Sequence, residues 1–314
     1  MDFRQLRYFL EVAAHQNVSR AAEKLHVAQP AVSRHIHRLE RELGVELFSR
    51  VGRGVVLTKA GMLMSEQAAS ILRQVERARD AVAAEGLVPQ GTVSIGAPPS
   101  VGYVLFPVLI EAYQALYPNV TVRLVEGMTR NLIECLQADS IDIALVSTAA
   151  SASANENDRD LVYNAIARED MYLFGARGGP PLPREISVTK LSGLPLILTG
   201  KPNAAREVLE HAASSAGVIL KVAVEIESLM VMKELVRNGK GYAVAPYSAL
   251  HGDMDNYVIA RVKNVSIIRM LVRRSDRPAT PAMSELMRIA TEKLEELKRA
   301  GIFCPVGASG ARRR

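Results

Sequence analysis

The sequence contains very little cysteine and has no long apolar run. Only Cys135 and Cys304 occur among 314 residues, which excludes a disulfide framework and is typical of a reducing compartment. No window approaches the roughly 18 consecutive apolar residues of a membrane-spanning helix. The N-terminus also lacks the basic and apolar regions of a signal peptide. We therefore expect a cytoplasmic protein with no membrane partner.

Motifs for catalysis, nucleotides and metals are missing as well. The segment 92–96 lacks the first glycine of a Gly-x-Ser-x-Gly elbow and lies inside an expected strand. The segment 239–241 has neither the third glycine of a dinucleotide loop nor the spacing of a phosphate-binding loop. The histidines and cysteines are not spaced as metal ligands. We expect no enzyme activity, no cofactor and no metal.

The composition is that of a globular protein, with charge concentrated at one end. Hydrophobic residues make up 48% and charged residues 23%, which excludes wholesale disorder, and the length indicates two or three domains. The net charge is +6. Residues 1–60 hold ten basic and six acidic residues together with four of the six histidines. This placement favours a small N-terminal module that binds a polyanion.

The first 60 residues have the pattern of a winged helix-turn-helix. Apolar residues recur at helical spacing from Phe3 to Ala13, Ser19 is suited to cap a second helix, and Pro30 lies near the start of a third. Gly44 ends the third helix. Two short strands are expected at 45–48 and 55–58, around a tip that holds Arg50 and Arg53.

A long helix, which Thr58 can cap, is expected next. Apolar residues on it step alternately by four and three positions, which is typical of a two-stranded coiled coil. This predicted dimer seam consists of Met64, Ala68, Ile71, Val75, Ala78 and Val82. The alternative is an amphipathic helix that packs on its own chain. Residues 86–91 are expected to break the helix and form a linker.

After Gly91 the sequence alternates between β-branched runs and helical patterns, which predicts parallel sheets with helices on their faces. Residues 147–160 are polar and indicate an exposed connection, and a second series starts at Leu161. Strands near 161–167 and 265–270 are expected to cross between two lobes. A cleft between such lobes is the default place for a ligand.

The segment 18–61 resembles the winged helix-turn-helix of LysR-type transcriptional regulators. The similarity rests on several motifs, which are Ala21-Ala22, Gln29 to Ser33, Leu39-Glu40, Leu43-Gly44, Leu47-Phe48 and Leu57-Thr58. Tyr117-Pro118, Glu126-Gly127, Asp142 to Leu145 and Gly239 to Pro246 are also similar to the family's regulatory domain. The resemblance covers nearly the whole chain, apart from residues 303–314.

The resemblance implies an α+β multidomain fold. A winged helix-turn-helix (1–58) precedes a long dimerisation linker helix (59–86) and a hinge (87–91). A two-lobed α/β domain similar to periplasmic binding proteins follows, with lobe I at 92–163 and 267–302 and lobe II at 164–266. Residues 303–314 are expected to form a flexible basic tail.

In this family the third helix enters the major groove, so the resemblance implies which residues bind DNA. These are Ser19, Arg20, Gln29, Pro30, Ser33, Arg34, His37, Arg50 and Arg53. Glutamine can pair with adenine and arginine with guanine, whereas the arginines of the wing suit phosphates. Arg34 can instead contact only phosphate or pair with a glutamate on its own helix, and His37 can belong to a solvated helix face.

The resemblance also implies an effector site where strands end and helices begin. Its residues are Pro99, Ser100, Val101, Thr129, Thr199, Lys201, Asn203 and Pro246. The family uses hydroxyls at the positions of Ser100 and Thr129 to hold a small organic ligand, often a carboxylate. Both residues can also simply cap helices, and Lys201 can be a solvated surface residue.

Together these features predict a sequence-specific transcriptional regulator that a small, anionic organic effector switches. The implied partners are double-stranded promoter DNA, the effector, RNA polymerase and further copies of the chain, as a homotetramer built from dimers. The alternatives are a cytoplasmic small-molecule-binding α/β protein or an enzyme, each with an appended DNA-binding module.

Overall fold

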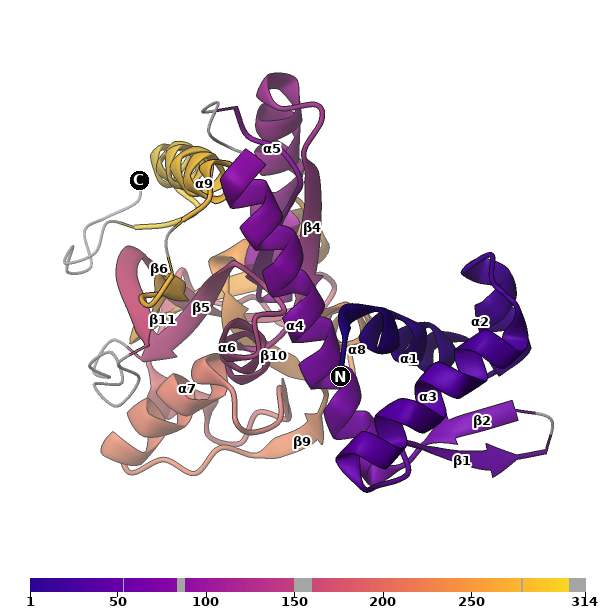
Figure 1. The fold of residues 1–314 in the computed structure, drawn as a ribbon. Coiled ribbons are helices and arrows are strands. Elements are labelled where there is room, and N and C mark those ends of the chain that lie inside the picture. The colour runs from indigo at the N-terminus through magenta and orange to yellow at the C-terminus, as the bar shows by residue number, and fades with distance from the viewer. Residues whose placement is uncertain (53, 84–87, 150–159, 278, 305–314) are drawn as a thin grey trace. The chain divides into compact units, whose positions relative to one another are not determined.

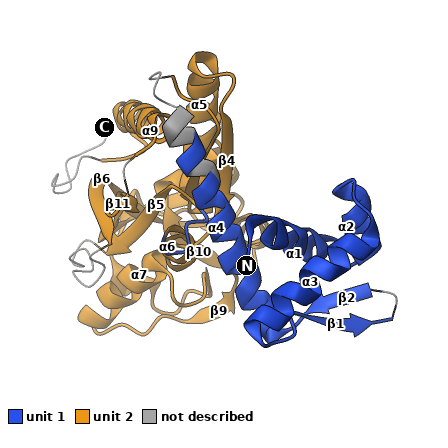
Figure 2. Cartoon of the chain, in the orientation of Figure 1, with its two compact units in different colours: residues 1–86, 137–140 blue, residues 87–136, 141–314 orange. Residues whose placement is uncertain are grey.

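The computed structural model describes residues 1–52, 54–83, 88–149, 160–277 and 279–304 (Figure 1). These residues divide into two compact units (Figure 2). The first unit comprises Met1–Gly86 with Gln137–Ser140, and the second comprises Leu87–Leu136 with Ile141–Arg314. We describe each unit by itself.

The first unit is built from helices and a two-stranded wing. Its elements are α1 (Phe3–His15), α2 (Val18–Lys24), α3 (Gln29–Leu43), β1 (Phe48–Val51), β2 (Gly54–Leu57) and α4 (Lys59–Ala83). One apolar face of each of α1, α2 and α3 is buried in a common core around Phe9, Ala21 and Val32. Gly44 ends α3 with φ +71°, a left-handed conformation that costs glycine little.

Two local expectations for this unit need correction. Asn17, not Ser19, caps α2, because its side-chain oxygen accepts from the backbone N–H groups of Ser19 and Arg20 at 2.9 and 3.1 Å. The helix therefore begins two residues earlier, at Val18, and Ser19 lies within it. The first wing strand starts at Phe48 rather than Val45. The expected cap of the long helix is confirmed, since Thr58 Oγ1 accepts from the N–H of Gly61 at 2.9 Å.

The second unit is organised around a mixed sheet in the order β4-β3-β5-β11-β6-β10-β8-β9. Its elements are β3 (Thr92–Ala97), α5 (Pro99–Leu116), β4 (Thr121–Glu126), α6 (Thr129–Gln137), β5 (Ile143–Ala149), β6 (Leu161–Ala176), β7 (Glu185–Ile186), β8 (Leu196–Leu198), α7 (Ala204–Ser215), β9 (Val222–Glu225), α8 (Leu229–Arg237), β10 (Tyr242–Pro246), β11 (Tyr257–Arg274) and α9 (Pro281–Arg299). The short β7 pairs with β11 outside this order.

The strands β6 and β11 connect the two halves of the sheet. They pair with each other in antiparallel register, β11 also pairs with β5, and β6 also pairs with β10. The expected crossovers at 161–167 and 265–270 are therefore parts of two long strands. Each strand is longer than expected, since β6 continues to Ala176 and β11 begins at Tyr257.

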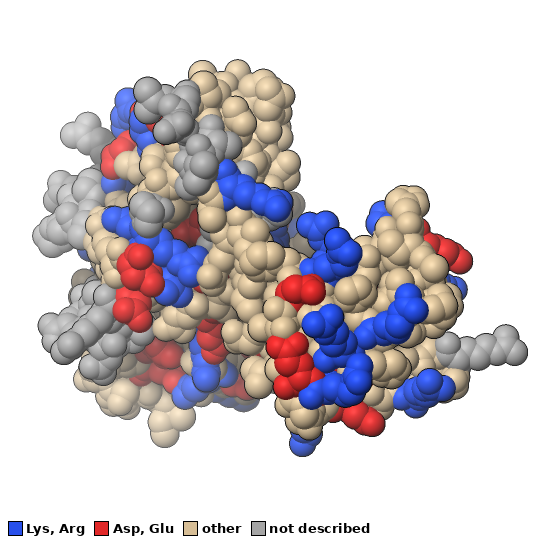
Figure 3. Space-filling view, viewed as in Figure 1, with Lys and Arg blue, Asp and Glu red and all other residues tan. Residues whose placement is uncertain are grey.

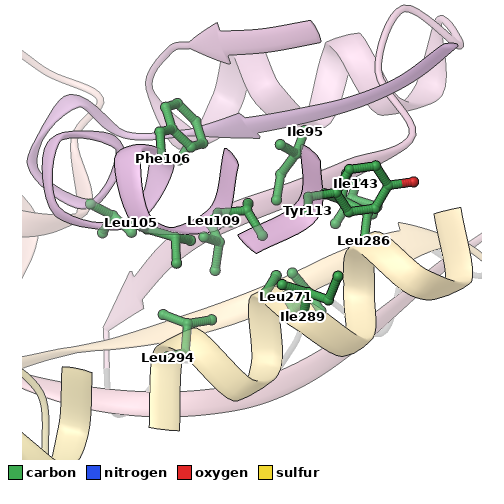
Figure 4. Close-up of a cluster of buried hydrophobic side chains, with 14 of the residues drawn as sticks. Ile95, Leu105, Phe106, Leu109, Tyr113, Ile143, Leu271, Leu286, Ile289 and Leu294 are labelled. Atoms are coloured by element: carbon green, nitrogen blue, oxygen red, sulfur yellow. The ribbon is translucent and has the colours of Figure 1, made fainter. Parts of the chain in front are cut away.

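Helices cover both faces of each half, as the alternation of side chains along the strands requires. Helices α5 and α9 share one core with alternate residues of β5, including Ile143 and Leu145, and Figure 4 shows part of this core. The intervening Ala144 and Val146 pack against α6 on the opposite face. In the other half, α7 and α8 cover opposite faces in the same way.

Candidate functional site

The turn between α2 and α3 is held by backbone hydrogen bonds over two small residues. Leu25 N–H donates to Ala21 O at 2.9 Å, and Val27 N–H donates to Ala22 O at 3.0 Å. Both alanines are buried, so that larger side chains would separate the two helices. His26 has φ +54°, a left-handed conformation that completes the reversal of the chain. The two helices thus meet in a compact helix-turn-helix.

The predicted DNA-contacting residues of α3 lie on its accessible face. Gln29, Pro30, Arg34 and His37 are exposed and Ser33 is partly buried, whereas Val32, Ile36 and Leu39 on the opposite face are buried. Gln29 Nε2 donates to Ser33 Oγ at 2.9 Å. Within the described residues the Arg34 side chain makes no hydrogen bond or ion pair, so the alternative pairing with a glutamate on its own helix is not formed. The arginine is therefore accessible to an external partner.

Glu40 links this helix to the wing. Its Oε1 atom accepts from the backbone N–H groups of Leu47 and Phe48 at 2.9 and 3.3 Å, which fixes the start of β1. Its Oε2 atom lies 3.2 Å from His37 Nδ1. The sequence singled out Leu39-Glu40 as a motif but did not assign this task to the carboxylate. The Leu47 amide precedes the wing and the Phe48 amide is its first, so Glu40 occupies these two donors where the first strand begins, three residues later than predicted.

Three of the four remaining predicted DNA contacts are also at the surface. Ser19 and Arg20 are exposed on α2, and Arg50 is exposed on β1. Arg53 lies outside the described residues. Figure 3 shows lysine and arginine side chains on the visible face of the first unit, interleaved with acidic ones. This surface can approach phosphates.

The predicted dimer seam divides along α4. Met64, Ala68 and Ile71 pack with the core of the helix-turn-helix, and Ala68 is wholly buried there. For these three residues the structure matches the alternative interpretation, a helix packed on its own chain. Ala78 is exposed and Val75 is partly buried, whereas the side chain of Val82 lies outside the description.

In the second unit, Ser100 and Thr129 lie at the starts of α5 and α6, as predicted. Thr129 Oγ1 donates to Ser147 O at 3.1 Å and accepts from Ser147 N–H at 3.0 Å, so its hydroxyl braces the end of β5. Pro99 is the first residue of α5. Val101, also predicted for the effector site, lies in the hydrophobic core.

Ser100 contacts a buried ion pair that the sequence analysis did not identify. Arg269 on β11 pairs with Glu169 on β6, with Nη2 and Nε of the guanidinium at 2.6 and 2.8 Å from Glu169 Oε2. Nη2 also donates to Ser100 Oγ at 3.1 Å and to Ser248 Oγ at 3.4 Å. Nη1 donates to Ser147 Oγ. Arg269 is 2% exposed and Glu169 is 0% exposed.

This cluster joins the two halves of the unit. Ser100 and Ser147 belong to the half of α5 and β5, whereas Ser248 follows β10 in the other half. The backbone N–H of Ser248 also donates to Glu169 Oε1. The sequence signal that could have indicated the burial of Glu169 and Arg269 is the alternation of inward and outward residues along each strand. Glu169 and Arg269 occupy inward positions at which their neighbours two residues away are apolar and buried.

The predicted lobe II residues have partners of their own. Lys201 Nζ lies 2.6 Å from Glu210 Oε2, and Arg206 Nη1 donates to Thr199 O at 2.9 Å. Burial raises the pKa of Glu210, but hydrogen bonds from Lys201 and Arg206 outweigh it, so the pKa lies below its usual value. The ammonium group of Lys201 is thus already paired with an acid.

Asn203 caps α7 by accepting from the Arg206 N–H at 3.1 Å, and its Nδ2 contacts the Met128 sulfur at 3.4 Å. Pro246 is buried at the end of β10. A second contact between the two halves places Lys233 Nζ 5.9 Å from the ring centroid of Tyr103. Side chains of both halves therefore interact, Asn203 with Met128 and Lys233 of α8 with Tyr103 of α5.

The described residues contain no group of three or more His, Cys, Asp or Glu residues that could hold a metal ion. Across the same residues, none of the helices is long and apolar enough to cross a membrane.

Comparison with known proteins identifies the class. Residues 3–62 match the model of the bacterial regulatory helix-turn-helix protein, lysR family, and residues 87–295 match the LysR substrate binding domain. The chain belongs to the LysR family of bacterial transcriptional regulators. This confirms the family and the fold class expected from the sequence.

Particular relatives agree with this assignment. The chain is 31% identical to the nitrogen assimilation regulatory protein nac of Escherichia coli K12 over 299 residues, which cover 91% of this chain and 94% of that protein. It is 29% identical to the DNA-binding transcriptional dual regulator OxyR of the same organism, over 80% of each chain.

Solved structures show the same architecture. The LysR family regulator CbnR has a TM-score of 0.71 and 26% identity, over 94% of this chain and 99% of CbnR. The full-length CbnR complex with target DNA has the same score and identity, over 93% and 100%.

Proposed function

We propose that this LysR-family regulator binds promoter DNA as a homotetramer and is switched by a small organic anion held between the two halves of its second unit. The domain boundaries expected from the sequence belong to this proposal, with lobe I at 92–163 and 267–302 and lobe II at 164–266. The observation that carries the effector site is the position of the Ser100 hydroxyl, at the start of α5 and against residues that link both lobes.

For DNA, the exposed face of α3 supports direct contact with bases. Gln29, Ser33 and Arg34 lie on one accessible face, and the Arg34 guanidinium makes no hydrogen bond or ion pair with the described residues. We assign Arg34 to base contact and the exposed Arg50 to phosphate. Ser19, Arg20, Pro30 and His37 complete the proposed interface, with Arg53 at the tip of the wing.

For the effector, a hydroxyl at the first turn of a long helix favours an anionic group, because the helix N-terminus is positively polarised. The lobes are joined by β6 and β11. A ligand that contacts both lobes changes the equilibrium between two relative arrangements of the lobes only if it binds these arrangements with different affinity. We propose that this change alters the bend of bound DNA and the access of RNA polymerase. Thr199, Lys201, Asn203 and Pro246 form the proposed lobe II side.

The test combines a ligand screen with substitution at the site. Small organic acids are screened for thermal stabilisation of the full-length protein, and hits are retested on Ser100→Ala with Thr129→Ala. We expect the double substitution to abolish ligand-dependent stabilisation. Unchanged stabilisation would remove the effector from this site. Footprinting on promoter DNA with and without the hit then reports whether the ligand changes DNA binding.

A further inference from the structure

The ion pair beneath Ser100 indicates what charge the effector carries. We propose that Arg269, Glu169, Ser100 and Ser248 form a charge-selecting element, and that the effector presents a single negative charge to it. This inference rests on the proposed function, since it concerns the ligand of the same site. Its members Glu169 and Arg269 lie on the crossing strands, and neither they nor Ser248 belong to the effector site expected from the sequence.

The hydrogen bonds between Arg269 and the two serines have a fixed direction. A guanidinium group can only donate, so the hydroxyl oxygens of Ser100 and Ser248 act as acceptors toward Arg269. Each hydroxyl keeps one proton. Among the described residues, neither hydroxyl donates a hydrogen bond to a protein acceptor. Both serines are more than nine-tenths buried, and a buried donor without an acceptor is costly. The missing partner is therefore a hydrogen-bond acceptor.

The two serine hydroxyl groups share one guanidinium nitrogen. Both hydroxyl oxygens accept from the same nitrogen, Arg269 Nη2, at 3.1 and 3.4 Å. The distance between the two oxygens therefore cannot exceed the sum of these distances. A carboxylate has two oxygens and can accept from both hydroxyls at once. Ser100 and Ser248 come from opposite lobes. A carboxylate that bridges them would thus favour one setting of the lobes.

The charges of the buried cluster balance each other. Glu169 neutralises Arg269 within the buried cluster, so the pair contributes little net charge to the site. One carboxylate is supported by the hydroxyl donors and by the N-terminus of α5. A second negative charge close to the first would lie near the Glu169 carboxylate, and among the described residues the two basic side chains of the proposed site, Lys201 and Arg269, are already paired with Glu210 and Glu169. Glu169 is accordingly a specificity-determining residue that selects against dianions.

The test uses two probes that have the same carbon skeleton length and differ in charge, butyrate and succinate. Thermal unfolding and calorimetric titration of the full-length protein are performed at matched ionic strength. We expect wild type to prefer butyrate. We expect Glu169→Gln, which leaves Arg269 uncompensated, to prefer succinate, with half-saturation at a concentration lower than in wild type by about tenfold or more.

Controls assign this change to the site. Glu292→Gln removes an exposed carboxylate that pairs with Arg288 at 2.7 Å, and it should leave both probes unaffected. Adding Ser100→Ala to Glu169→Gln should remove the gain for succinate. If Glu169→Gln does not fold, single Ser100→Ala and Ser248→Ala variants, which retain the ion pair, should each weaken butyrate binding by about tenfold.

The results separate this inference from the proposed function. Equal succinate affinity in wild type and Glu169→Gln, a preference of wild type for succinate, or no response of wild type to butyrate at millimolar concentrations would each overturn it. If screened ligands lose their effect in the Ser100→Ala, Thr129→Ala variant but Glu169→Gln leaves the charge preference unchanged, only this inference fails. If ligands bind that variant normally, the effector site itself is misplaced.

Discussion

The wing of the DNA-binding unit depends on one carboxylate, which makes Glu40→Ala an informative substitution. Glu40 Oε1 accepts from Leu47 N–H at 2.9 Å and from Phe48 N–H at 3.3 Å. Leu47 is 1% exposed, so its amide would lose its acceptor without gaining water. The substitution therefore leaves a buried donor unpaired at the start of β1.

The magnitude follows from the two bonds. A hydrogen bond to a charged group contributes about 1.5–3 kcal/mol, and the longer bond to Phe48 adds less than the shorter one. The Glu40 side chain is 15% exposed, so partial solvation reduces the gain. We expect a loss of about 2 kcal/mol in the free energy of opening of the wing. This corresponds to a fall of roughly thirtyfold in amide protection.

Hydrogen exchange of the Leu47 and Phe48 amides measures this loss directly. Glu40→Gln keeps an acceptor oxygen and should retain most of the protection. Glu42→Ala is the matched control on the same helix, since that exposed carboxylate contacts only the terminal amine of Met1 in the described structure. It should change protection by less than about 0.5 kcal/mol. Unchanged protection in Glu40→Ala would refute the assignment of Glu40 as the anchor of the wing.

Three further predictions concern other parts of the chain. If Arg34 contacts a base, Arg34→Ala should weaken binding to the specific site more than binding to random DNA, as measured by competition titrations at fixed salt. Equal losses on both DNAs would mean that Arg34 contacts only phosphate. Tyr113→Phe removes a 3.0 Å hydrogen bond to a carbonyl of α9 and should destabilise the second unit by about 1 kcal/mol in urea unfolding, and an unchanged midpoint would contradict this. Burial raises the pKa of Tyr113 to about 12, so stability should fall as pH rises above 10, and the fall should be smaller in Tyr113→Phe. The pKa of Glu210 is lowered overall, because hydrogen bonds from basic neighbours such as Lys201 outweigh the effect of burial. The contribution of Glu210 to folding stability is therefore present above its usual pKa of 4.5 and is lost as the pH falls through the lower pKa of the folded state. Glu210→Gln should reduce the loss of stability at acid pH, and an identical loss in the variant would count against the pairing.

Much of the fold was predictable because it is encoded locally. The apolar period of α3, the glycine at its end and the hydroxyl of Thr58 act within one or two turns of chain, and the structure has them as expected. Where local signals compete, the prediction shifted. Both Asn17 and Ser19 are suitable caps, and the earlier residue is used because its side chain reaches two free N–H groups.

The sequence by itself determined the helix-turn-helix, the alternation of strands and helices, and the placement of Ser100 and Thr129 at helix starts. Only the tertiary structure decided what these hydroxyls contact. Glu169 and Arg269 are 100 residues apart, and the antiparallel register of β6 and β11 brings them together. The hydrophobic pattern within one strand does not specify how that strand is aligned with a distant strand. The charge of the proposed site therefore depends on long-range strand pairing, whereas the elements that surround it depend on short-range pattern.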